Sequence, residues 1–163
     1  MSFSVWVTGP EQGGMQAVAD EVARRLAARE VSHEVIDPRT PGIDRLGQDG
    51  FERPAAFVAG MLARHGVAAI VALPIPTRAA RERVREALGR MIEVYVRPDR
   101  PPESDYEPPE RAEVEIAAGD PHGADHVLRT LEVLELIPRS TDRAYTHQEE
   151  REVIRRLKAF GYL

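Results

Sequence analysis

The chain has 163 residues, no cysteine and a formal net charge of −5 at pH 7. This length predicts one domain with its own core, and the lack of cysteine excludes disulfides, cysteine nucleophiles and thiolate metal sites. The acidic balance argues against a nucleic-acid binder that works through a broad basic surface. Neither a signal peptide nor an apolar run of membrane-spanning length is evident, so we expect a cytoplasmic protein that binds no nucleic acid and no membrane.

Short apolar runs alternate along the chain with longer segments of helical periodicity. We expect strands at residues 3–8, 32–37, 67–73, 91–96 and 112–117. We expect helices at residues 15–29, 54–65, 77–90, 125–136 and 146–160. The segments 38–53 and 97–109 are rich in Gly or Pro and should be irregular.

This alternation predicts an α/β fold. The run 67–73 is apolar throughout, which is typical of a central strand in a parallel sheet. We therefore expect three layers, with a mostly parallel sheet and helices on both of its faces. Residues 1–138 should form this domain, and residues 139–163 a C-terminal helical extension.

The first strand runs into a glycine-spaced turn. Gly9 and Gly14 have the Gly-x-x-x-x-Gly spacing of a phosphate-binding loop (P-loop), and a helical pattern follows. In that motif the next two residues are Lys, which contacts the β- and γ-phosphates, and Ser or Thr, whose hydroxyl holds Mg²⁺. Here these places hold Met15 and Gln16, and Glu11 adds a negative charge within the turn. The frame of a P-loop NTPase-like kinase is present without the side chains that hold phosphate and magnesium.

Two interpretations of Gly9, Gly13 and Gly14 remain open. The favoured one is a tight strand-to-helix turn in which these glycines supply positive φ. The other is a working phosphate cradle. Under either, the backbone N–H groups and the N-terminus of the following helix could hold a small anion.

The chain resembles the adenylylsulfate kinases, P-loop enzymes that use ATP to phosphorylate the ribose 3′-hydroxyl of adenosine 5′-phosphosulfate. The resemblance covers roughly residues 3–136, and its specificity comes from the order of the matching segments. These are Val-Trp-Val-Thr-Gly (5–9), Val-Ile-Asp (35–37), Pro-Thr-Arg (76–78), Ile-Glu-Val-Tyr-Val (92–96) and Asp-Tyr-Glu-Pro-Pro-Glu (105–110). The resemblance implies the P-loop kinase fold and a link to sulfate assimilation.

The departures from the family's pattern fall on its functional positions. Besides Met15 and Gln16, the family's Asp-Gly-Asp corresponds to Asp37-Pro38-Arg39, so one acid remains. The family's substrate-binding segment and its lid are both shortened, at residues 51–54 and 97–105 respectively. We therefore expect a degenerate family member, a pseudoenzyme that acts as a binding or regulatory module.

The alternative is a residual adenylylsulfate kinase or another nucleotide-dependent phosphotransferase, and only this alternative requires ATP and Mg²⁺. The candidate site residues are the same in both cases. Asp37 is a relic catalytic acid, although a turn residue at the end of a strand is the simpler interpretation. The degenerate P-loop comprises Gly9, Gly13, Gly14, Met15 and Gln16. Three arginines are candidate anion ligands that could replace the missing Lys: Arg39, Arg53 and Arg78. No metal site is predicted.

The C-terminal segment begins with a capping-box pattern, Thr146 followed by Glu149. Val153, Ile154 and Leu157 then continue an apolar stripe. The stripe could pack on the sheet of its own chain, or on a second copy or another protein partner. The sequence favours neither.

Overall fold

The computed structural model describes residues 2–140 and 147–163. Five strands form one parallel sheet in the order β2-β3-β1-β4-β5. The strands are β1 (Ser4–Thr8), β2 (His33–Ile36), β3 (Ala68–Val71), β4 (Met91–Arg97) and β5 (Val114–Ala117). The predicted α/β fold is confirmed, and every pairing in the sheet is parallel.

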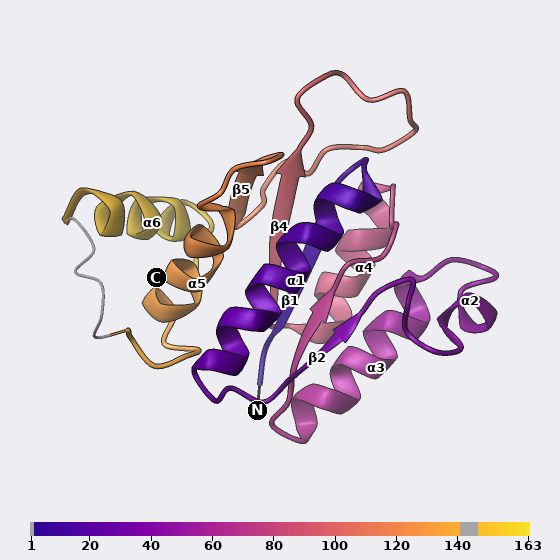
Figure 1. Cartoon of the computed structure of the whole chain (residues 1–163), viewed down its shortest axis with the longest axis horizontal. Helices are drawn as coiled ribbons and strands as arrows, with labels where there is room; N and C mark the ends of the chain where they lie inside the picture. Colours follow the sequence, from indigo (N-terminus) through magenta and orange to yellow (C-terminus); the bar gives the residue numbers. More distant parts are fainter. Residues whose placement is uncertain (1, 141–146) are drawn as a thin grey trace.

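Helices cover both faces of the sheet and complete the three layers (Figure 1). Helices α1 and α5 lie on one face, and α3 and α4 pack side by side on the other. The helices are α1 (Gln12–Ala28), α2 (Ile43–Leu46), α3 (Glu52–Arg64), α4 (Arg78–Leu88), α5 (Gly123–Val133) and α6 (His147–Ala159).

Strand β1 lies at the centre and all five of its residues are buried. Val5 aligns with Ile70 of β3 and Ile92 of β4, and all three side chains join the cluster under α1 and α5. Because side chains alternate along a strand, Trp6 points to the opposite face and packs in the cluster under α3 and α4.

Two elements differ from the sequence-based expectation. Helix α1 begins at Gln12 rather than Met15, so it occupies positions that the motif assigns to a loop. The short helix α2 lies in the segment 38–53, which was expected to be irregular, and its Ile43 is buried against the α3 and α4 layer.

The connection from β4 to β5 contains no helix and forms the long loop at the top of Figure 1. It is attached to the start of α4, because Glu107 N donates to Pro76 O at 2.9 Å and Arg78 N donates to Oε2 of Glu107 at 2.9 Å. Tyr106 is buried there and stacks on Tyr95 with ring centroids 6.0 Å apart.

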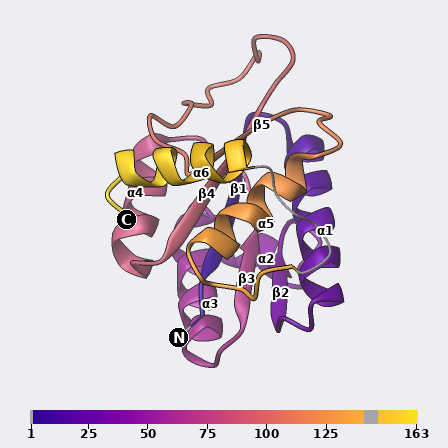
Figure 2. The same cartoon turned by 90° about the vertical axis from the view of Figure 1, so that its left-hand side faces the viewer.

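Helix α6 packs on α5 of its own chain, on the side of the molecule seen in Figure 2. Leu157 is 1% exposed, and Arg156 Nε donates to Ala112 O at 3.1 Å. The apolar stripe is therefore covered by its own chain, although by α5 rather than by the sheet, whereas contact with a partner stays a prediction. The predicted cap, Thr146, lies outside the described residues.

Candidate functional site

The turn after β1 is short. Gly9, Pro10 and Glu11 alone separate the strand from α1, and Glu11 is the residue at the helix N-cap. A Cβ atom at Gly9 would lie 2.9 Å from Val96 O, so glycine allows the turn to pass close to the backbone of β4. The close approach of the turn to the β4 backbone explains why a glycine stands at position 9.

The expectation that Gly9, Gly13 and Gly14 supply positive φ is wrong, because none of them is among the residues with left-handed backbone. Gly13 and Gly14 lie in the first turn of α1, and Met15 N donates to Glu11 O at 3.2 Å as a helical bond. A P-loop surrounds a polyphosphate with loop N–H groups. Here residues 12–14 present only the free N–H groups of a helix N-terminus.

Met15 stands where the P-loop motif has its Lys, and its side chain is 2% exposed within the core under α1. Its Cγ would lie 3.4 Å from a Cβ built on Gly9, so the thioether packs directly beneath the turn. This side chain points into the core and not toward a ligand above the turn. Helix periodicity explains its burial, because Ala19, Val22 and Leu26 share its face.

Gln16 stands where the motif has its magnesium-binding hydroxyl. Its side-chain amide donates to Oδ2 of Asp37 at 2.8 Å and to Oδ1 of Asp20 at 3.0 Å. Arg39 donates Nη2 to the same two carboxylates, at 2.7 Å each. One amide and one guanidinium thus bridge the C-terminal end of β2 to the first turns of α1.

Asp37 is 3% exposed, and both of its oxygens accept hydrogen bonds. The Arg39 side chain is the main cause that lowers the pKa of this carboxyl below its usual range, in opposition to burial. Arg39 is exposed, and its hydrogen bonds to Asp37 raise its own pKa. Because Asp20 and Asp37 outnumber the single guanidinium, this group carries a net negative charge and does not attract an anion.

The three arginines predicted as anion ligands lie in three different places. Arg39 is the one beside the turn, and its charge is compensated as described. Arg53 lies on α3 and lines a groove between α3 and α4. Arg78 begins α4 and pairs with Glu110 at 2.5 Å. Of these three arginines, Arg39 is the one that contacts a side chain of α1, through Asp20.

Comparison with known proteins identifies the family of this chain. The sequence model of the family described as Adenylylsulphate kinase matches residues 1–104. The chain belongs to the adenylylsulfate kinase family. A protein of Pyrococcus abyssi named "Probable adenylyl-sulfate kinase" is 30% identical over 99% of this chain and 98% of its own length. An adenylyl-sulfate kinase of a Synechococcus strain is 37% identical over 57% of both chains.

Solved structures of the family agree with this fold. A variant of the APS kinase CysC of Mycobacterium tuberculosis superposes with a TM-score of 0.65 and 25% identity, over 80% of this chain and 98% of that one. A hexameric APS kinase of Thiobacillus denitrificans gives a TM-score of 0.57 at 24% identity, over all of this chain and 30% of that one.

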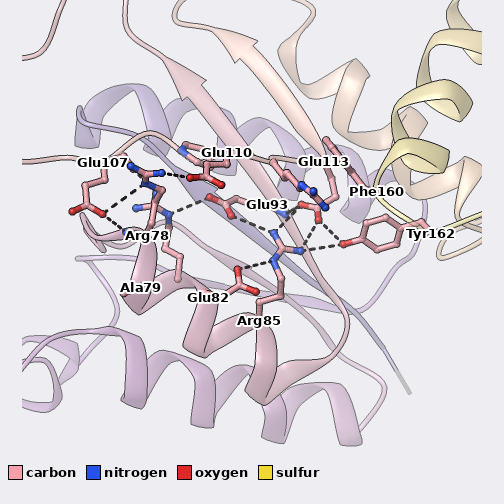
Figure 3. Close-up of a pocket in the computed structure, with 13 residues that line it drawn as sticks. Arg78, Ala79, Glu82, Arg85, Glu93, Glu107, Glu110, Glu113, Phe160 and Tyr162 are labelled. Carbon is pink, nitrogen blue, oxygen red and sulfur yellow. Dashed lines mark hydrogen bonds and ion pairs between the residues drawn. The ribbon is translucent and has the colours of Figure 1, made fainter.

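A second polar centre of this family member lies away from the turn, in a cavity of about 680 Å³ (Figure 3). Helix α4, the β4–β5 connection and the end of the chain enclose it. Arg81 Nε lies 3.1 Å from Oε1 of Glu93, and both side chains are almost fully buried. Arg85 pairs with Glu93 at 3.2 Å and with Glu113 at 2.5 Å.

This network connects the C-terminal segment with the end of β1. Tyr162 donates its hydroxyl to Glu113 and lies 3.1 Å from Arg85 Nη1, which ties the end of α6 to the centre. Thr8 Oγ1 lies 3.4 Å from Oε1 of Glu93, which ties in the end of β1. Burial raises the pKa of Glu93, and burial together with the Glu113 carboxylate raises that of Tyr162.

Arg81 and Arg85 were not predicted as site residues from the sequence, although a signal was present. They share the inward face of α4 with Val84 and Leu88, at the spacing that should have placed them in the interior.

Among the residues described by the structure, no three His, Asp or Glu side chains are grouped as a metal site would require. No helix within residues 2–140 and 147–163 is long and apolar enough to cross a membrane.

Proposed function

We propose that this family member has kept the fold of an adenylylsulfate kinase without its phosphoryl transfer, and acts as a binding or regulatory module linked to sulfate assimilation. One observation carries the proposal: Met15, in place of the P-loop Lys, is packed in the core. Phosphoryl transfer depends almost wholly on positioning and on charge stabilisation. A buried thioether supplies neither.

The surroundings of Met15 support the same proposal. Magnesium needs oxygen ligands and usually binds through a carboxylate together with the substrate phosphates. Asp37 already accepts hydrogen bonds on both oxygens, and Gln16 presents its amide N–H to that carboxylate. These residues, as arranged, do not fit a magnesium ion.

A residual adenylylsulfate kinase is the second candidate, and the relatives' names favour it. The Pyrococcus abyssi protein, similar over 99% of this chain, is named a probable adenylyl-sulfate kinase. This activity would require ATP and Mg²⁺. It would also require Arg39 to leave Asp20 and Asp37 and turn toward the N-terminus of α1, where it could take the place of the Lys.

One assay separates the two candidates. The full chain is incubated with ATP, Mg²⁺ and adenosine 5′-phosphosulfate, and ADP release is followed by a coupled assay. We expect no turnover above that of a chain carrying Asp37→Asn. Turnover near about 1 per second that is lost in Asp37→Asn would establish the residual kinase and reject our proposal.

A thermal-shift screen tests the binding role and the predicted small anion at α1. The ligands are ATP, ADP, adenosine 5′-phosphosulfate and sulfate, and each is added on its own so that no reaction can occur. A ligand at 100-fold excess over its dissociation constant adds about 2.7 kcal/mol to the free energy of unfolding. We expect weak or no stabilisation by ATP·Mg²⁺, and a low-micromolar dissociation constant would contradict the proposal.

A further inference from the structure

A groove of about 520 Å³ lies between α3 and α4, on the layer opposite to α1. The residues that line it fall into three kinds, namely small or apolar side chains, two serines and three arginines. They are Ser2, Ser4, Arg53, Ala56, Phe57, Ala59, Gly60, Ala63, Arg64, Ala87, Leu88 and Arg90. It shares no residue with the turn at α1 or with the cavity around Arg85.

The groove presents a large apolar side chain to solvent. Phe57 is 69% exposed, and Met61, one turn further along α3, is 38% exposed. Phe3, by contrast, is only 3% exposed. Small residues, Ala56, Gly60 and Ala63, line the groove beside Phe57, and Leu88 covers α3 at Gly60, where its Cδ2 would lie 3.6 Å from an added Cβ atom.

The rim of the groove is cationic. Within residues 2–140 and 147–163, no carboxylate forms an ion pair with Arg53, Arg64 or Arg90, and none of the lining residues is acidic. The chain as a whole has 27 acidic residues against 22 basic ones. In the cavity around Arg85, by contrast, the arginines of the ion-pair network are matched by Glu93 and Glu113.

The spacing of the arginines argues against a single small anion. Arg53 and Arg64 are eleven positions apart on α3, which corresponds to about 16 Å along the helix axis. One phosphate or sulfate spans far less than this distance. Arg90 lies between α4 and β4, where its carbonyl accepts from Ser4 N at 3.2 Å and Ser4 Oγ at 3.2 Å. An extended ligand with several negative charges matches this arrangement.

We infer that the groove between α3 and α4 is a docking surface for an acidic peptide segment of another protein, one that carries a large apolar side chain between its carboxylates. The apolar side chain would pack on Phe57 and the small residues of α3. The carboxylates would pair with the three arginines, and Arg is well suited to such paired contacts. A second copy presenting the same face would bring like charges together, so a symmetric dimer through this groove is disfavoured.

The test is a selection of peptides on the full chain. A phage-displayed library of random 16-residue peptides is selected against the immobilised protein, and the best peptides are synthesised and titrated by fluorescence anisotropy. We expect the selected peptides to be enriched in Asp and Glu around Phe, Leu or Trp. The triple change Arg53→Glu, Arg64→Glu and Arg90→Glu should weaken them at least about tenfold, and Phe57→Ala should do the same.

Two variants serve as matched controls. Arg100→Glu reverses an exposed arginine on the β4–β5 connection, and Leu163→Ala shortens a side chain that is 56% exposed. Both should bind the peptides as the wild type does. All positions changed are on the surface, and a thermal melt checks that each variant is folded.

Three outcomes would overturn the inference. The first is a selection whose peptides are not acidic, or bind the triple variant as well as the wild type. The second is self-association in sedimentation velocity that Phe57→Ala abolishes, because the occupant is then a second copy. The third is sedimentation with phosphatidylglycerol vesicles that depends on the three arginines and is not displaced by the selected peptides, because the surface then binds lipid.

Discussion

The Gln16 side-chain amide donates to Oδ2 of Asp37 at 2.8 Å, so the residue in place of a magnesium-binding hydroxyl holds the acid that remains from the family's motif. Arg39 completes the arrangement from the side of β2. The three residues satisfy one another, which leaves little capacity for a ligand.

The first prediction concerns restoration of the P-loop residues by the double change Met15→Lys with Gln16→Ser. Met15 is buried beneath the turn, so the Lys ammonium enters the core without a carboxylate. We expect a loss of about 3–5 kcal/mol in the free energy of unfolding and no gain in ATP affinity. Urea unfolding and calorimetry measure both quantities.

Ala17→Lys is the matched control for that experiment, because Ala17 is exposed on the same helix. Its stability should stay within about 0.5 kcal/mol of the wild type. If the double variant is instead stable and binds ATP tightly, the loop can open into a phosphate cradle and the helical start of α1 is not fixed.

The second prediction concerns the pH dependence of stability through Asp37. Its pKa is lowered in the folded protein, chiefly by Arg39. The carboxylate therefore contributes stability above the unfolded-state pKa of about 3.9, and this contribution is lost as the pH falls through the lower folded-state pKa. Asp37→Asn should reduce the free energy of unfolding by about 1–3 kcal/mol at pH 7, and by progressively less below pH 4.

Asp44→Asn provides the comparison, since Asp44 is exposed on α2. It should change the free energy of unfolding little at pH 7 and at pH 3. A difference between wild type and Asp37→Asn that stays constant from pH 7 to pH 3 would mean that Asp37 is not held ionised by Arg39.

The third prediction concerns the buried ion-pair network. Arg85→Met removes the cation shared by Glu93 and Glu113 and leaves two buried carboxylates near each other. We expect a loss of about 3–5 kcal/mol in the free energy of unfolding, measured by urea at pH 7. Tyr162→Phe removes one hydrogen bond to Glu113 and should cost only about 1 kcal/mol.

Arg83→Met is the control on the same helix, because Arg83 is exposed and its contact with Glu52 is 3.5 Å long. Exposed pairs of this kind contribute about 0–1 kcal/mol. Equal losses for Arg83→Met and Arg85→Met would show that the network does not depend on burial.

Residue patterns predicted the strands and layers well because these follow from burial. The apolar run 67–73 contains β3, and the five expected strands all occur in the sheet. The start of α1 was not predictable in the same way. Glycine fits a loop, a positive-φ turn and a close approach equally, so Gly9 and Gly14 alone do not distinguish a P-loop from a helix N-terminus.

The contacts among the candidate site residues could not be predicted from the sequence. Asp37 and Arg39 are two positions apart in sequence, and the pairing of Asp37 with Gln16 depends on how β2 meets α1. Arg53 and Arg78 looked equivalent to Arg39, yet they lie in separate cavities because α3 and α4 begin at different points around the sheet. Long-range pairing of this kind carries no local signal in a single sequence.

The last prediction concerns removal of α6 by deletion of residues 145–163. Leu157 is 1% exposed, and burial of such a side chain contributes about 1.5–3 kcal/mol. The deletion also removes Tyr162 from Glu113 and Arg156 from the carbonyl of Ala112. We therefore expect a lower melting temperature, together with aggregation visible in light scattering because the surface of α5 is uncovered.

Lys158→Ala, on the exposed side of α6, is the control and should leave both measurements unchanged. A truncated chain that is monodisperse and melts with the wild type would show that α6 adds nothing to its own subunit, and its apolar stripe would then be available to a partner.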